Sequence, residues 1–127
     1  MKRLLALPFL LCLTLGSCKT AAYVNHPGSY NTFDSQSYDT LIVTHSVIES
    51  TKADLAANKF PAQIAGAVKT ALNNLITAYD VADSSYLVYH AAAAAGTATA
   101  AQQTTVATNL SNVNASTMNL TTAKAGN

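Results

Sequence analysis

Hydrophobic residues recur at helical spacing along most of the chain. The longest stripe steps by three or four residues and consists of Ile64, Val68, Leu72, Leu75, Tyr79, Ala82, Tyr86 and Tyr89. This spacing places all of its members on one face of an α-helix. Pro61 suits the first position of such a helix, and Gly96 suits its carboxyl-terminal end. The pattern therefore predicts a long central helix over 61–95.

A second stripe predicts a helix over 99–124. Its members alternate steps of four and three residues and are Val106, Leu110, Val113, Thr117 and Leu120. Thr99, with Gln102 three residues on, has the spacing of a capping box. No charged residue occurs from Ala91 to Ala123, so the outer face of this helix is expected to be polar but neutral.

The stretch 38–58 is ambiguous. Leu41, Ile48 and Leu55 recur every seven residues, with His45 and Lys52 between them, which suits one helix face. The competing interpretation is a strand over 40–48, because this part is rich in β-branched residues. Good helix formers follow from residue 49 on, so a single helix is favoured.

Two further features bound this first helix. Asp34, Ser35 or Ser37 could cap its beginning. Lys59 and Phe60 precede Pro61, and the residue before a proline disfavours helical backbone. Three helices joined by short turns predict an all-α fold, a small antiparallel three-helix bundle over 38–127.

The amino-terminal 17 residues have the layout of a secretion signal. Lys2 and Arg3 form a charged start, and the apolar run from Leu4 to Leu15 is too short to span a bilayer as a helix. Then follow Leu15, Gly16, Ser17 and Cys18. This order of an apolar residue, two small residues and a cysteine resembles the lipobox of bacterial lipoprotein precursors.

The resemblance implies cleavage between Ser17 and Cys18 and acylation of Cys18, which would hold the protein to membrane lipid. Lys19 stands where an aspartate would mark retention at the inner membrane, so the resemblance implies the outer membrane, at its periplasmic face or surface, in a Gram-negative host. An ordinary secretion signal with a chance cysteine is the alternative. The expected division is a signal peptide over 1–17, an acylated Cys18 with a flexible tether over 18–37, and the helical domain.

Composition narrows the function classes. Charged residues make up 10% of the 127 residues, well below the roughly 25% usual in soluble domains. Loss of Lys2 and Arg3 with the signal leaves five basic residues of the seven against six acidic ones, and no arginine. A polybasic nucleic-acid binder is thereby excluded. With Cys12 removed and Cys18 acylated, no thiol remains for disulfides, metals or catalysis.

The remaining chemistry-bearing residues suggest neither an enzyme nor a cofactor or metal site. His45 and His90 are not level in a hairpin that turns near residue 60, and His26 falls on the tether. Asp80 and Asp83 share a helix face without further ligands, which favours a solvated patch. The serines lack the setting of a catalytic nucleophile.

These features lead to two functional hypotheses. The first is a lipid-anchored lipoprotein that serves as a structural or protein-interaction module of the cell envelope, with the neutral 99–124 face meeting an envelope partner. The alternative is a helical bundle that binds a small molecule in a pocket lined by Tyr79, Tyr86 and Tyr89, because a helical aromatic stripe can line such a pocket as well as pack in a core.

Overall fold

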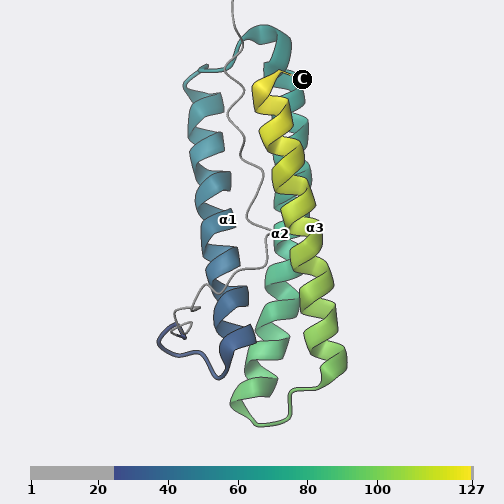
Figure 1. Ribbon diagram of the computed structural model, residues 1–127. Helices are drawn as coiled ribbons and strands as arrows, with labels where there is room; N and C mark the ends of the chain where they lie inside the picture. Colours follow the sequence, from purple (N-terminus) through teal and green to yellow (C-terminus); the bar gives the residue numbers. More distant parts are fainter. Residues whose placement is uncertain (1–24, 127) are drawn as a thin grey trace, which may run out of the picture.

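The computed structural model describes residues 25–126 and shows three antiparallel helices. They are α1 (Thr32–Ala56), α2 (Ala62–Ala94) and α3 (Ala100–Ala125). The start of α1 and the α2–α3 turn lie at one end of the bundle, and the α1–α2 turn and the end of α3 lie at the other (Figure 1). The predicted all-α three-helix bundle is confirmed. The predicted signal peptide 1–17 and Cys18 lie outside the described residues.

Helix α1 begins earlier than the sequence indicated. It starts at Thr32 and not at residue 38, so 32–37 belong to the helix and not to a tether. The cap is Asn31, whose side-chain oxygen accepts a hydrogen bond from the backbone N–H of Asp34 at 2.9 Å. Asp34, Ser35 and Ser37, which were expected as caps, lie inside the first turns and are buried. Residues 40–48 are helical, which rules out the strand alternative.

The α1–α2 turn is short and closed by backbone hydrogen bonds. Asn58 takes the left-handed conformation with φ of 52°, and the N–H of Lys59 donates to the carbonyl of Asp54 at 3.0 Å. This pattern satisfies carbonyl groups that the end of a helix leaves free. Pro61 then precedes the first residue of α2 instead of being that residue. The predicted break between the first two helices is confirmed, and α2 starts one position later than predicted.

The α2–α3 turn uses the residues that the sequence indicated. Gly96 has φ of 69°, and the N–H of Thr97 donates to the carbonyl of Ala92 at 2.8 Å. Thr99 and Gln102 form the predicted capping box, with the Thr99 N–H donating to the Gln102 side-chain oxygen at 2.9 Å. The polar serines and aspartates at 80–85 do not interrupt α2.

The core lies along the line where the predicted stripes converge. α2 packs closely against α3 and also against α1, whereas α1 and α3 touch only slightly. The 33 residues of α2 make a rod of about 50 Å at 1.5 Å per residue. The buried apolar side chains are Leu41, Ile48, Val68, Leu72, Leu75, Ala82, Tyr86, Tyr89, Val106, Val113 and Leu120.

The buried seam of α1 is half polar. Between the predicted apolar positions lie hydroxyl residues and not His45 and Lys52, which are exposed. Thr44 and Thr51, which lie between these positions, can be buried because each hydroxyl donates to the backbone carbonyl one turn earlier. Two serines, Ser35 and Ser37, are buried nearer the start of the helix.

Candidate functional site

A buried carboxylate organises the end of the bundle where α1 begins. Asp34 is completely buried, and its two oxygens lie 2.9 and 3.0 Å from Nδ1 of His90, near the end of α2. The backbone N–H of Tyr30 donates to the same carboxylate at 3.0 Å. In the carboxylate form Asp34 only accepts hydrogen bonds, and Nδ1–H of His90 is then the donor. Asp34 thus joins the amino-terminal segment, α1 and α2.

Tyr86 completes this cluster. Its ring is buried, and its hydroxyl lies 3.3 Å from Nδ1 of His90. Burial and then the charge of Asp34 raise the pKa of Tyr86 to about 12, and a hydrogen bond to Asp34 adds to this effect. The hydroxyl therefore stays protonated at neutral pH and acts as a donor towards the buried carboxylate.

Tyr89 serves a different polar partner. Its hydroxyl accepts a hydrogen bond from the side-chain nitrogen of Asn31 at 3.1 Å, and its ring meets Phe33 edge-on with the centroids 5.1 Å apart. Tyr89 therefore supports the residue that caps α1. The bond spans 58 positions of the sequence, so it fixes the start of α1 against the end of α2.

The three tyrosines proposed as a pocket lining do not share one hollow. Tyr79 lies half-buried against His45, with ring centroids 5.8 Å apart, and burial raises its pKa, with smaller contributions from Asp83 and Asp80. Tyr89 is engaged with the α1 cap. Tyr86 borders a hollow at the start of α1, and a tyrosine-lined binding pocket stays a prediction.

That hollow lies beside the Asp34 cluster and measures about 310 Å³. The amino-terminal segment forms one wall, where His26 stacks on Tyr38 with centroids 4.5 Å apart. His90 and Leu87 of α2 form part of the opposite wall. The segment is held in place because the His26 backbone N–H donates to the Ser35 hydroxyl. The hollow therefore exists because the amino-terminal segment, residues 26–30, folds back against the bundle.

The predicted separation of the histidines is consistent with the structure. His45 packs against Tyr79, whereas His90 pairs with Asp34 and stacks on Tyr30 at 5.0 Å. Within residues 25–126, no group of three or more histidine, cysteine, aspartate or glutamate side chains could hold a metal ion.

The outer face of α3 is polar and carries no charge up to Ala123, and several of its threonine hydroxyls are bonded to the helix itself. Five threonine hydroxyls along the helix each donate to the backbone carbonyl four residues earlier, at 2.9–3.1 Å, and the bond from Thr104 to the carbonyl of Ala100 is 2.9 Å. Met118 adds an apolar side chain that is 70% exposed. The threonines of α3 that bond in this way are Thr104, Thr105, Thr117, Thr121 and Thr122.

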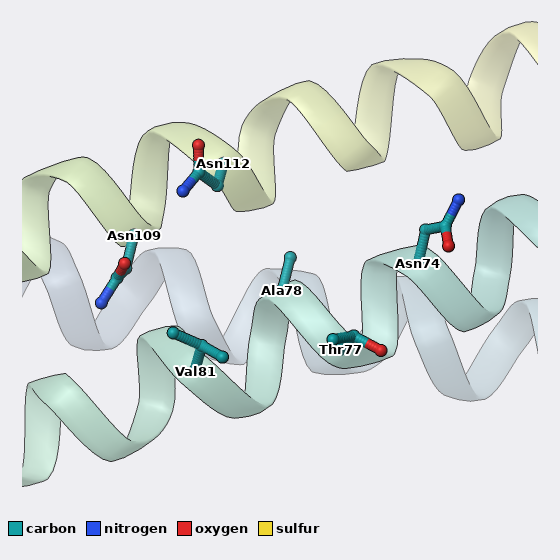
Figure 2. A pocket seen from close by; sticks show the side chains of 6 residues that line it. All are labelled: Asn74, Thr77, Ala78, Val81, Asn109 and Asn112. Carbon is teal, nitrogen blue, oxygen red and sulfur yellow. The ribbon is translucent and has the colours of Figure 1, made fainter.

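Asparagines mark the seam between α2 and α3. A hollow of about 260 Å³ opens there, and Figure 2 shows Ala78 pointing from α2 towards α3, while Asn109 and Asn112 come from the facing helix. Asn109 is engaged, because its side-chain nitrogen donates to the Ser85 hydroxyl at 3.0 Å. The small size of Ala78 leaves the seam open at this level.

Comparison of the chain with protein-family models, curated proteins and solved structures finds no match. None of the three helices in residues 25–126 is both long enough and apolar enough to cross a membrane. Function must therefore be argued from the residues themselves.

Proposed function

We propose that this protein is a bacterial lipoprotein, anchored to membrane lipid through acylated Cys18, whose helical bundle acts as an interaction module of the cell envelope. The single observation that carries the interaction role is the neutral face of α3, which is exposed, carries no charge up to Ala123 and has several threonine hydroxyls already bonded to the backbone. Such a face costs less to desolvate when a partner covers it than a face with unpaired charges.

The folded-back segment supports a short tether. Residues 26–30 are held against the bundle by Ser35 and Asp34, so only the chain between Cys18 and Asn25 would separate the lipid from the fold. At about 3.5 Å per residue this stretch reaches about 25 Å at most. The bundle would then stand close to the membrane with the start of α1 nearest to it.

The α3 face is tested by placing charge on it. Ala115→Glu combined with Met118→Glu changes two exposed positions and should leave the fold intact. We expect the doubly substituted lipoprotein to lose a discrete crosslinked adduct that the wild-type protein forms in intact cells. The matched control is Ser46→Glu with Ser50→Glu, which places the same charges on the exposed side of α1. Retention of the adduct in the α3 variant, or equal loss in both, would overturn the assignment.

The anchor is tested separately. Cys18→Ala removes the thiol that the lipobox resemblance identifies as the acyl acceptor. We expect the variant to appear in the soluble fraction without acyl groups. Persistent association of this variant with membranes would contradict the anchor, whatever the result for the α3 face.

A further inference from the structure

A hollow lies between α1 and α2, near the turn that joins them. It measures about 490 Å³, within the range of 300–1,000 Å³ typical of small-molecule sites. Its apolar lining comes from both helices and consists of Leu55, Ala65, Gly66, Leu72 and Ile76. Leu55 and Ile76 remain half-buried, because nothing in residues 25–126 covers them on this side.

Gly66 keeps the groove open. It lies inside α2, where glycine is about 1 kcal/mol less favourable than alanine. A Cβ atom added at Gly66 would meet no other atom within 4 Å. The missing side chain is therefore not required by close packing of the helices, and its absence leaves room above the groove floor.

The rim of the groove is cationic. Lys52 and Lys69 border it together with the amide side chain of Asn73, and no carboxylate contributes to its lining. Lys69 has no ion-pair partner among the described residues. Lys52 pairs with Glu49 at 2.8 Å, but both side chains are about half exposed, so this pair is weak and can be exchanged.

The surrounding charge reinforces this rim. Every lysine of residues 25–126 lies in the half of the bundle near the α1–α2 turn, since Lys59 belongs to that turn and Lys124 to the end of α3 at the same end (Figure 1). Asp54 is already paired with Lys59 at 2.8 Å, and Glu49 reaches the rim through its pair with Lys52. An anionic group approaching the groove therefore meets one uncompensated ammonium group, that of Lys69, and a second, that of Lys52, whose weak pair with Glu49 it can replace.

We propose that this groove binds a fatty carboxylate, with the acyl chain along the apolar floor and the carboxylate at Lys69 and Lys52. The apolar floor alone would accept any alkyl chain. The two ammonium groups, which can donate to a carboxylate but not accept, select an anionic head. This site is independent of the lipid anchor and of the α3 face.

The proposal is tested by titrating the protein with dodecanoate below its micellar concentration. The amide groups are monitored by two-dimensional NMR during the titration. The full chain is used with Cys18→Ala, which removes the acyl acceptor and so any competing attached chain. We expect saturable shifts confined to residues around the groove. Dodecyl maltoside, with the same chain and a neutral head, should bind more weakly by up to about fivefold, the discrimination that an exposed charge pair can supply.

Two variants separate the floor from the rim. Gly66→Leu should fill the groove and abolish detectable binding while the melting temperature stays the same or rises, and Ala67→Leu, on an exposed site of the same helix, should bind normally. Lys69→Gln should weaken dodecanoate binding about fivefold, whereas Lys124→Gln should not. Absence of dodecanoate binding, equal binding of the maltoside, or undiminished binding in folded Gly66→Leu would overturn the proposal.

Discussion

The carboxylate of Asp34 lies 2.9 Å from Nδ1 of His90, although the two residues are 56 positions apart. This pair connects the first turn of α1 to the last part of α2 at a point where the apolar core gives way to polar groups. Asp34 is fully buried, whereas the His90 side chain is 34% exposed. The pair therefore closes the end of the bundle and holds the amino-terminal segment, through Tyr30, in the same cluster.

Loss of the buried carboxylate should destabilise the whole bundle. Asp34→Ala removes the acceptor for His90, Tyr30 and Tyr86, and hydrogen bonds to charged groups contribute about 1.5–3 kcal/mol. We expect the free energy of unfolding to fall by about 2–4 kcal/mol in urea denaturation. Asp80→Asn, at an exposed position of α2, should change it by less than about 0.5 kcal/mol. Equal stability of the two variants would refute the role given to Asp34.

Tyr86 should make stability fall at alkaline pH. Its pKa is raised to about 12 in the folded protein from the ordinary value of 10.0, so the folded state favours the protonated hydroxyl. This contribution is complete below pH 10 and is lost as pH rises through about 12, because the unfolded chain releases the proton first. One pKa unit corresponds to about 1.4 kcal/mol, so the loss is on the order of 2–3 kcal/mol.

The measurement is urea denaturation of wild type and Tyr86→Phe at a series of pH values from 8 upwards. The variant should be less stable at pH 8 because it lacks the bond to Asp34, and its stability should decline less steeply above pH 10. Tyr79→Phe is the matched control, because the pKa of Tyr79 is also raised but its side chain is less buried than that of Tyr86. Parallel pH profiles for wild type and Tyr86→Phe would show that Tyr86 is not the responsible group.

The buried serines of α1 should respond in opposite directions. The Ser37 hydroxyl has no hydrogen-bond partner among the described residues, so Ser37→Ala removes an unsatisfied buried group and should stabilise the protein by up to about 1 kcal/mol. Ser35→Ala removes the acceptor of the His26 N–H and should cost about 1 kcal/mol. Thermal unfolding of both variants measures the two effects. Destabilisation by Ser37→Ala would contradict the predicted difference between the two serines.

Replacement of glycine by alanine should change stability in opposite directions at two positions. Gly96 has φ of 69°, where alanine costs about 1 kcal/mol, so Gly96→Ala should lower the melting temperature. Gly66 is helical and has open space around its Cβ position, so Gly66→Ala should raise stability by about 0.5–1 kcal/mol. Calorimetry of the two variants tests this contrast, and the same sign for both would be inconsistent with it.

Much of the fold follows from local sequence, because α2 and α3 bury apolar residues at regular spacing. Val106, Val113 and Leu120 lie where a seven-residue repeat puts them, and the capping box at Thr99 depends only on neighbouring residues. The start of α1 could not be predicted in this way. Its first buried positions are Asp34 and Ser35, which look like surface residues until their partners from elsewhere in the chain are known.

The same reason explains the incomplete prediction of the site. The sequence places Tyr86 in a helical aromatic stripe, but it indicates only a capping role for Asp34 and gives His90 no partner. A register argument could have joined them, since Asp34 lies about as far before the α1–α2 turn as His90 lies after it. The α1–α2 groove has no sequence signal of its own, because its residues come from two helices and their spacing within each helix is that of any helix face.

The mature amino terminus provides the most direct test of the central claim, that this bundle is held to membrane lipid. Mass spectrometry of the protein isolated from its native envelope should find a first peptide that begins at Cys18 and carries fatty acyl groups. A first peptide that still contains Met1 to Ser17, or one that begins at Cys18 without acyl groups, would contradict the account.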